Sequence, residues 1–320
     1  MTVIIHVGMS KAASTTIQNI VNSHKQFYYF GKYTEDKRAS GKIYSSPQSE
    51  YLTKSLVNLD RFSGLSKLHT KKIDKELKFA KKNKKVFFFS NEHFCESTCA
   101  FFQGEILKEV FKNPKVLIII RNQIDAIKSL YKFAGYFLRF APNPLSKKIV
   151  KFDDFFDYLH HNYKNTGGHK ARDWVADYFR ILDFSSFIKI NEKIFGKKNI
   201  IIVPFELFIK DFDFLLRAIK KSSSFNFSNG FNKKAHDNST SHLAARNLKL
   251  IYYLSKLPFQ KVLKKINKVT NLNLIEKLGK GTELEMSEKQ VRKIHEIYAS
   301  GNNELSKRYS IDLKSLGYPL

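Results

Sequence analysis

The first 24 residues change abruptly from an apolar run to a polar loop and then to a helical pattern. Residues 3–7 read Val-Ile-Ile-His-Val, are rich in β-branched side chains, and are followed by Gly8. Such a run predicts a strand that is buried in a sheet. Residues 9–16 are mainly small or hydroxyl side chains around Lys11, and the apolar residues after them recur at helical spacing. The sequence therefore predicts a strand, a loop and a helix in direct succession, which is the basic unit of an α/β fold.

Three more apolar runs of similar length are predicted to be strands of the same sheet. They are Val86–Phe89, Val116–Ile120 and Ile200–Val203. Helical periodicity marks three intervening or following segments, at residues 67–85, 124–138 and 171–195. Because strands alternate with helices, the sequence predicts an α/β fold with a parallel sheet between two layers of helices.

The chain of 320 residues is predicted to form one domain. Its α/β core covers residues up to about 210, and the remainder, residues 211–320, has a mainly helical pattern. Residues 27–64 show little periodicity and are interpreted as a lid or an acceptor-binding insertion. Residues 242–268 hold seven basic residues and no acidic ones among spaced leucines. Peripheral contact with an anionic membrane is therefore an alternative there to ordinary packing on the core.

The formal net charge is +27, and only 10 of the 56 basic residues are arginine. Such a charge attracts polyanions, among them a phosphorylated cofactor, an anionic glycan and a membrane surface. Lysine gives a diffuse field and not the bidentate contacts typical of base recognition, so no nucleic-acid partner is expected. The alternative is that the lysines only form solvated faces.

The sequence shows no sign of a membrane-spanning or secreted protein. No apolar run approaches the ~20 residues that cross a bilayer. The first residues lack the basic region and the long apolar region of a secretory signal. The two cysteines, Cys95 and Cys99, suit a reducing compartment and exclude a disulfide framework. We therefore expect a cytoplasmic protein.

The loop at residues 9–16 has the composition of a phosphate-binding loop. Lys11 supplies a positive charge, and Ser14, Thr15 and Thr16 supply hydroxyl groups at the predicted start of a helix. The first N–H groups of a helix have no partner within it and point toward bound anions. The loop therefore predicts an anion site at the carboxyl end of the first strand.

The pattern differs from that of the nucleotide triphosphatases. Their loop requires two glycines separated by four residues and then Lys-Ser or Lys-Thr. Here Lys11 follows Gly8 by three positions, and no second glycine precedes it. The strand at 116–120 is followed by Arg121, where a magnesium-binding aspartate would otherwise stand. These residues favour direct binding of an anion without a metal.

The segment Lys11-Ala12-Ala13-Ser14-Thr15-Thr16 resembles the 5′-phosphosulfate loop of sulfotransferases that use 3′-phosphoadenosine 5′-phosphosulfate (PAPS). Arg121 and Ser129, eight residues apart after a predicted strand, resemble the 3′-phosphate-binding pair of that family. The resemblance implies a P-loop-like sulfotransferase fold and metal-free transfer of a sulfuryl group to a hydroxyl acceptor. All six loop residues, Arg121 and Ser129 are then expected to bind the donor.

A weaker resemblance extends along the rest of the chain. It concerns Phe205-Glu206-Leu207, Tyr298, Asn302, Leu305, Tyr309 and Gly317-Tyr318-Pro319. These positions resemble bacterial members of the family that often sulfate carbohydrates. A carbohydrate is therefore the expected acceptor.

Two positions of the loop depart from the family pattern. Ser10 stands where proline is usual, and Ala13 stands where glycine is usual. If Ala13 adopts a positive φ, the strain is about 1–2 kcal/mol. No residue that would stack on the adenine is recognisable.

By resemblance, Lys11 contacts the bridging oxygen of the donor, while Ser14 and Thr15 hold its 5′-phosphate. An acceptor hydroxyl also needs a general base close to the sulfur. Glu92 lies just beyond the carboxyl end of the second predicted strand and is the first choice. His93 is the adjacent alternative, since strand alternation lets only one of the two face the cleft easily.

A metal site is not expected in the same segment. His93, Cys95 and Cys99 lie close together in the sequence, but structural zinc normally needs a fourth ligand and a shorter cysteine spacing.

Two other functions remain open from the sequence. A magnesium-dependent nucleotide kinase would also place an anion-binding loop on a parallel sheet. A non-enzymatic module that binds polyanions would account for the charge. Each site residue also has an ordinary alternative: a surface lysine for Lys11, an ion pair for Arg121, a solvent-facing serine for Ser129 and a helix-start carboxylate for Glu92.

Overall fold

The computed structural model describes residues 1–9, 11–31, 33–34, 43–44, 67–91, 94, 100–131, 150–164, 175–223, 225–231 and 284–320. Contacts divide the chain into two compact units. The first comprises Met1–Asn122, Ile181–Asn238 and Tyr298–Leu320, and the second comprises Gln123–Arg180 and Ser239–Ile297.

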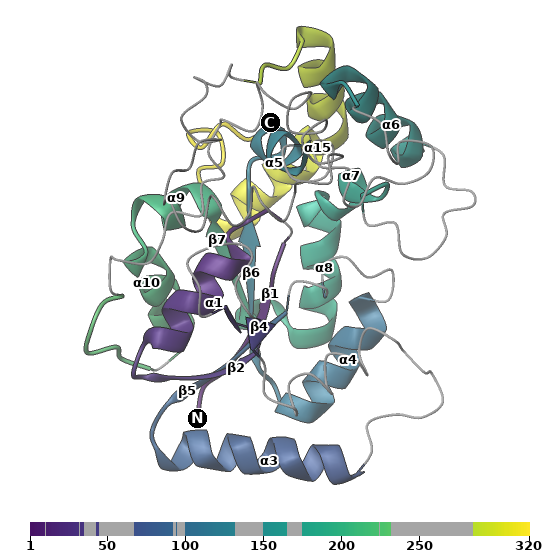
Figure 1. Ribbon diagram of the computed structural model, residues 1–320. Helices are drawn as coiled ribbons and strands as arrows, with labels where there is room; N and C mark the ends of the chain where they lie inside the picture. The colour runs from purple at the N-terminus through teal and green to yellow at the C-terminus, as the bar shows by residue number, and fades with distance from the viewer. Residues whose placement is uncertain are drawn as a thin grey trace, which may run out of the picture. The chain divides into compact units, whose positions relative to one another are not determined.

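The first unit contains a five-stranded parallel sheet with the order β2-β5-β1-β6-β7 (Figure 1). Its strands are β1 (Val3–Val7), β2 (Phe27–Gly31), β5 (Val86–Asn91), β6 (Lys115–Ile120) and β7 (Ile200–Pro204). A separate antiparallel pair is formed by β3 (Tyr33–Thr34) and β4 (Ile43–Tyr44). The sheet confirms the predicted α/β class and places β1 at its centre.

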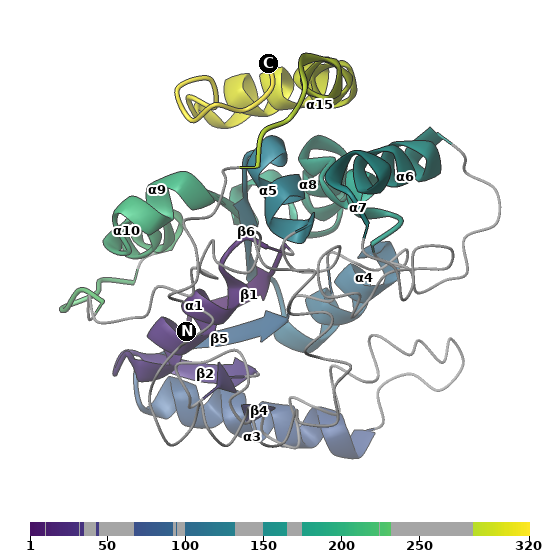
Figure 2. The same ribbon diagram turned by 45° about the horizontal axis from the view of Figure 1, so that its top comes forward.

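Helices cover both faces of this sheet (Figures 1 and 2). On one face lie α3 (Lys67–Lys82), α4 (Ala100–Phe111) and α8 (Phe184–Phe195), and on the other lie α1 (Ser14–Ser23) and α10 (Asp213–Ser222). A 3₁₀ turn (Lys197–Asn199) precedes β7, and the short helix α9 (Phe205–Lys210) follows it.

Alternating side chains of β5 fill the two cores. Phe87 and Phe89 both contact Phe111 of α4, with ring centroids 5.7 Å apart in each case. Phe88 points to the opposite face and meets Phe27 of β2 at 5.7 Å. All six residues of β5 are buried, and the first four form a continuous apolar run, as is usual in strands of parallel sheets.

The second unit is helical in its described part. It contains α5 (Gln123–Leu130), α6 (Phe152–Lys164), most of α7 (Tyr178–Ile181) and the first part of α15 (Glu288–Tyr309). The Tyr178 hydroxyl donates to the Ala126 carbonyl at 3.4 Å, and Gln290 Nε2 donates to Asp153 Oδ1 at 2.9 Å. These bonds join α7 to α5 and α15 to α6.

The structure corrects the interpretation of the segment at 27–64. Its first five residues, Phe27–Gly31, form the edge strand β2 of the central sheet and are not part of an insertion. The strand consists almost wholly of aromatic residues, which pack on both faces, so it lacks the polar alternation of a half-exposed strand. Residues 35–42 and 45–66 lie outside the described part.

The structure also divides the helix expected at 171–195. Helices α7 and α8 are separate, and Asp183 lies at the break between them. Its Oδ1 accepts a hydrogen bond from the Ser186 N–H at 3.1 Å and so caps α8. Aspartate at this place is a start signal for a new helix, and the apolar periodicity on either side obscured it.

Other predictions are met only in part by the described residues. Helix α5 occupies the first part of the pattern at 124–138, and residues 132–149 lie outside the description. The segment at 242–268, which led to the membrane interpretation, also lies outside it. Among the described helices, none is long and apolar enough to cross a membrane. The assignment of all 320 residues to one domain stays a prediction.

Candidate functional site

The loop after β1 has an unusual backbone. Lys11 has a φ of 64° and Ala13 a φ of 60°, so two residues with a Cβ adopt the left-handed conformation within three positions. Each carries a strain of about 1–2 kcal/mol. The positive φ considered for Ala13 from the sequence is therefore present. Such strain persists only where the surroundings enforce it, and it clusters at functional sites.

Hydrogen bonds hold the loop in this shape. The Ala12 N–H donates to the Met9 carbonyl at 3.1 Å, and the Ser14 hydroxyl donates to the same carbonyl at 3.5 Å. The Gly8 N–H donates to the Asn91 carbonyl of β5 at 3.3 Å, which ties the loop to the neighbouring strand. Met9 and Ala12 are buried, whereas Lys11 and Ala13 are half-buried.

The loop leads directly into the N-terminus of α1. Ala13 is the N-cap residue, and no side chain caps the helix among the described residues. The first turn of α1 contains no acidic side chain. Its N–H groups and the positive end of the helix dipole are therefore directed at the loop, where an anion is stabilised. Thr15 is exposed in this turn, whereas Ser14 and Thr16 are buried.

Arg121 brings a second cation to the loop. Its Nη1 donates to the Lys11 carbonyl at 2.6 Å, although the two residues are 110 positions apart in the sequence. The guanidinium carbon lies 4.3 Å from the ring centroid of Phe205, in cation–π geometry. Its Nε is buried and has no hydrogen-bond partner among the described residues. The Nε–H is thus a donor that none of the described residues uses.

The residues that follow Arg121 and Phe205 are joined to each other. The Asn122 N–H donates to Glu206 Oε1 at 2.8 Å. The Tyr318 hydroxyl donates to Glu206 Oε2 at 3.0 Å, and Asn122 Nδ2 donates to the Gly317 carbonyl at 2.5 Å. Burial raises the pKa of the Glu206 carboxyl, while these donors and the Arg121 charge act in the opposite direction.

A buried polar cluster lies beneath the loop. His6 of β1 is fully buried, and its Nδ1 is 2.8 Å from the Ser90 hydroxyl of β5. Gln18 of α1 donates to the same hydroxyl at 3.3 Å. Burial lowers the pKa of His6 to about 3, so the imidazole is neutral at ordinary pH. The cluster joins β1, β5 and α1, which are the elements that carry the loop.

The structure brings together most of the predicted donor-binding residues. Arg121 and the six loop residues Lys11–Thr16 all belong to the first unit, and Arg121 contacts the loop directly. Ser129 lies on α5 in the second unit and is half-buried. Glu92 and His93, the candidate bases, lie outside the described residues.

No cluster of three or more His, Cys, Asp or Glu side chains that could hold a metal occurs in the described part. Cys95 and Cys99 lie outside that part.

Sequence reasoning assigned no role to Phe205, Glu206 or Tyr318, although their segments were noted as weak resemblances. Phe205 and Glu206 directly follow β7, and ligands of parallel sheets collect beyond the carboxyl ends of strands. That position was the available signal for the first two residues. Tyr318 had no comparable signal, because its contact with Glu206 spans 112 positions.

This chain is similar to known proteins in its structure and not detectably in its sequence. No protein-family model matches the chain, and no curated protein gives a significant match. Among solved structures, a sulfotransferase from Alicyclobacillus acidocaldarius is 11% identical and superposes with a TM-score of 0.56 over 99% of this chain and 98% of its own.

Two more sulfotransferase structures are similar at lower scores. Mouse SULT7A1 complexed with PAP is 12% identical, with a TM-score of 0.41 over 94% of this chain and 84% of its own. The sulfotransferase domain from the curacin biosynthetic pathway is 11% identical, with a TM-score of 0.36 over 84% of this chain and 98% of its own. Since the match to the Alicyclobacillus protein extends over nearly the whole of both chains, this chain has the fold of that sulfotransferase.

Proposed function

We propose that this protein is a sulfotransferase that binds PAPS at the loop after β1 and transfers its sulfuryl group to a hydroxyl acceptor, with a carbohydrate as the expected class. The observation that carries the proposal is the contact between Arg121 and Lys11. It joins the segment that resembles the 5′-phosphosulfate loop to the segment that resembles the 3′-phosphate site. A bis-phosphorylated nucleotide needs both.

The loop and α1 fit the 5′ end of such a donor. The helix has no side-chain cap, its first turn has no acidic residue, and Lys11 adds a full positive charge. Two strained residues shape the backbone around this point. When bound, PAPS would supply the sulfuryl group and a phosphate leaving group.

Lys11 neutralises the negative charge that develops on the leaving phosphate, which is a large term in transfers of this kind. The exposed Thr15 hydroxyl is the more accessible donor to the 5′-phosphate, because Ser14 already donates to Met9. Both hydroxyls nevertheless lie at the same helix N-terminus. The loop therefore binds and orients the phosphosulfate with main-chain and side-chain donors together.

Arg121 fits a second phosphate. A guanidinium offers five donors in a fixed plane, and one of them is used on the Lys11 carbonyl. The Nε has no protein partner among the described residues, and the Phe205 ring covers one face of the group. An arginine held flat in this way is suited to in-plane contacts with phosphate oxygens. Ser129 is proposed as its partner by resemblance.

The acceptor must lose a proton as its oxygen bonds to sulfur. We assign this proton to Glu92, with His93 as the alternative, on sequence grounds alone. The S–O bond to the phosphate breaks as the new S–O bond forms, and the released charge falls beside Lys11. Because Arg121 stands where a metal-binding aspartate would otherwise follow β6, the proposed transfer needs no metal.

Ligand-induced thermal shifts test the proposal against its competitors. The purified protein is scanned with 3′-phosphoadenosine 5′-phosphate (PAP), with ATP and magnesium, and with a DNA oligonucleotide. We expect PAP to stabilise the protein most, and its effect to survive a chelator. A shift with magnesium-ATP alone would indicate a kinase, and a shift with DNA alone would indicate a polyanion-binding module. Radiolabelled PAPS with glycan, lipid and phenol acceptors then identifies the product.

A further inference from the structure

We infer that Gly317-Tyr318-Pro319, here called the tail, positions Arg121 for the 3′-phosphate by holding Asn122 and Glu206. This inference rests on the proposed function. It adds a role for a segment 195 positions away from Asn122 in the chain. The tail does not itself bind the nucleotide in this account.

Two dipeptides at the ends of adjacent strands form the base of the arrangement. Arg121-Asn122 follows β6 and Phe205-Glu206 follows β7, and the strands pair with Ile120 opposite Pro204. The first member of each dipeptide takes part in the cation–π contact, at 4.3 Å. The second members are joined through the Asn122 N–H and Glu206 Oε1. The hydrogen bond between Asn122 and Glu206 therefore fixes how Arg121 and Phe205 face each other.

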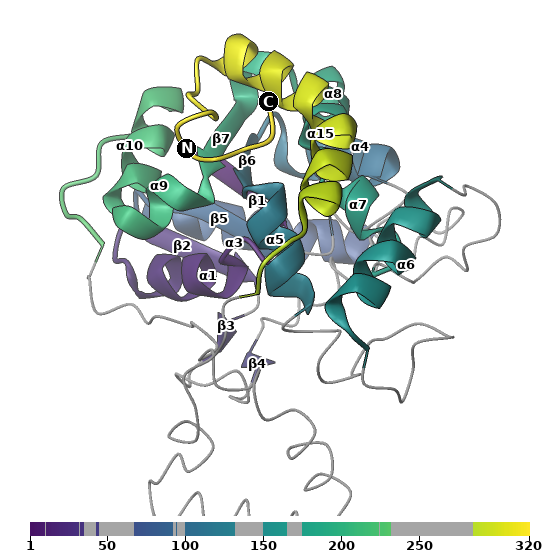
Figure 3. The ribbon, with the colours of Figure 1, turned by 90° about the horizontal axis from the view of Figure 1, so that it is seen from above.

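The tail bonds to the side chains of both Asn122 and Glu206. Tyr318 donates to Glu206 Oε2, and the Gly317 carbonyl accepts from the Asn122 amide. Gly317 has a φ of +76°, and a Cβ there would lie 3.0 Å from Asn122 Nδ2. A glycine is needed at this place for both reasons. Figure 3 shows the tail passing over the ends of β6 and β7.

The tail is itself firmly held. Buried Asn302 donates to the Pro319 carbonyl at 2.8 Å, and the Tyr318 N–H donates to the Leu313 carbonyl at 3.1 Å. Tyr318 is only 4% exposed. The tail is therefore a packed part of the first unit and not a frayed end.

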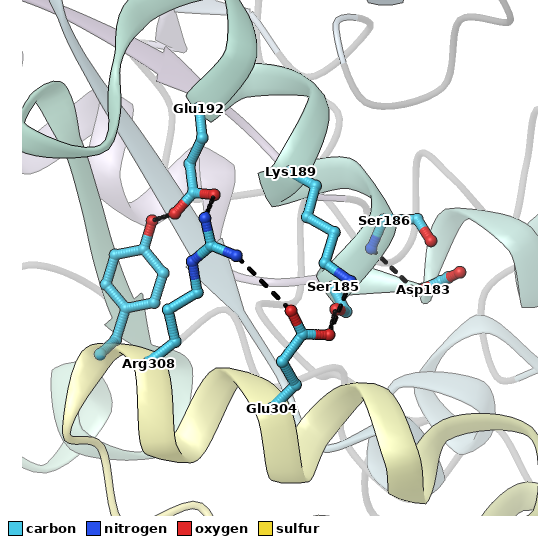
Figure 4. A network of polar contacts seen from close by, with 8 residues as sticks. Asp183, Ser185, Ser186, Lys189, Glu192, Glu304 and Arg308 are labelled. Carbon is cyan, nitrogen blue, oxygen red and sulfur yellow. Dashed lines mark hydrogen bonds and ion pairs between the residues drawn. The ribbon is translucent and has the colours of Figure 1, made fainter.

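The last turns of α15, which lead into the tail, are fastened to α8 (Figure 4). Arg308 and Tyr309 both bond to the buried carboxylate of Glu192. One turn earlier, Glu304 accepts from Lys189 at 2.6 Å and from Ser185 at 3.2 Å. This clip fixes the start of the segment that returns to the strand ends.

The tail has a specific electrostatic consequence for Arg121. Glu206 is a half-buried carboxylate whose charge is felt by the half-buried Arg121 guanidinium, and partial burial raises the pKa of Glu206. The Tyr318 hydroxyl donates to Glu206 Oε2 and so reduces the competition of this oxygen with a phosphate for Arg121. Among the described residues Arg121 has no carboxylate ion pair, and its partners are the Lys11 carbonyl and the Phe205 ring. The tail keeps the guanidinium available.

The test compares two tyrosines that make the same kind of bond. Tyr318→Phe removes the donor to Glu206, and Tyr309→Phe removes a donor to Glu192 while Arg308 still pairs with that carboxylate. Binding of PAP and of AMP, which lacks the 3′-phosphate, is measured by calorimetry. We expect Tyr318→Phe to weaken PAP binding by about three- to tenfold and AMP binding by less than about twofold. Tyr309→Phe should leave the ratio of the two affinities unchanged, because Arg308 and Glu304 still hold α15 to α8.

A double variant separates positioning from general damage. In the Arg121→Ala background, Tyr318→Phe should cause no further loss of PAP affinity, because the residue it positions is absent. An additive loss would overturn the inference. So would equal weakening of PAP and AMP by Tyr318→Phe, which indicates a structural role only.

A readout without nucleotide separates this inference from the proposed function. The Arg121 Nε–H is buried, so its NMR signal should exchange slowly with water in the wild-type protein. Exchange should become faster in Tyr318→Phe and stay slow in Tyr309→Phe. If that holds but neither nucleotide binds, the tail positions Arg121 and the proposed function is wrong. If PAP binds selectively but the signal and the affinity ratio are unaffected by Tyr318→Phe, the inference is wrong and the proposed function stands.

Discussion

The two halves of the proposed nucleotide site are built in different ways. The loop after β1 is made of consecutive residues, and it gains its shape from a strained backbone and from local bonds to Met9. The corner at the ends of β6 and β7 is assembled from three distant segments, through side chains of Arg121, Glu206 and Tyr318. A local site depends on backbone conformation, whereas an assembled site depends on the packing of the whole unit. The two should therefore fail in different ways when they are altered.

The largest effect is expected from Lys11→Ala. Loss of the only side-chain charge that the described loop supplies should lower the rate of sulfuryl transfer by about 10²–10³-fold. The melting temperature should change little. Lys11 is half-buried, and the group that accepts the Arg121 hydrogen bond is its main-chain carbonyl, which alanine retains. Rates with radiolabelled PAPS measure the effect, and Lys198→Ala, at an exposed surface lysine, is the control. Full activity of Lys11→Ala would show that Lys11 and its loop are not part of the active site.

The next effect is expected from Arg121→Ala, which alters the corner. Loss of a charge-assisted contact should weaken PAP binding by about 1.5–3 kcal/mol. AMP binding should change by less than about 0.5 kcal/mol, since AMP has no 3′-phosphate. Calorimetry with both nucleotides measures the difference. If both affinities fall equally, Arg121 only supports the Lys11 loop, and the distinction between the two halves is wrong.

Low pH should lower the stability of the protein through His6, which lies in the buried cluster next to the loop. Burial lowers the pKa of His6 to about 3 from an ordinary value of 6.5, so the folded protein holds the ring neutral. Above pH 6.5 this group has no effect on stability, and below it the unfolded chain gains protons that the folded protein does not. The free energy of unfolding should fall by about 2 kcal/mol between pH 7 and pH 5 from this residue.

Denaturant titrations at several pH values measure the His6 contribution. The matched variant is His6→Gln, which retains a polar group toward Ser90 but does not titrate. Its stability should depend less steeply on pH over the same range. Equal slopes for the two proteins would show that His6 is not the source.

The smallest effect is expected from Ala13→Gly. Glycine adopts a positive φ without strain, and this gain of about 1–2 kcal/mol is partly offset by the greater freedom of the unfolded chain. The variant should therefore be more stable by up to about 1 kcal/mol. Ala218→Gly, inside α10, is the control and should lose about 1 kcal/mol. Destabilisation by both substitutions would mean that the loop carries no strain.

The sequence was informative where structure is local. Four of the five sheet strands were predicted, because each is an apolar run between polar loops. The loop after β1 was recognised because its residues are consecutive and their composition is that of a phosphate-binding loop. The missed strand, Phe27–Gly31, lies at the sheet edge and packs aromatic rings on both faces, so neither alternation nor an aliphatic run marks it.

The corner could not be predicted as an assembly. Arg121 was assigned by its spacing to Ser129, but its contacts with Phe205 and the loop are set by the order of strands in the sheet. Tyr318 meets Glu206 only because α15 returns the chain to that edge. A hydrogen bond between residues so far apart leaves no periodic trace in the sequence.

The bonds from Gly317 and Tyr318 also bear on how the protein is made. A nascent chain that has emerged up to α10 already contains all five strands and the complete first loop. It still lacks the partners that hold Asn122 and Glu206. Such a translation intermediate should accept mononucleotides at its amino-terminal loop yet show no preference for a second phosphate, and that preference should arise only when synthesis has passed residue 318.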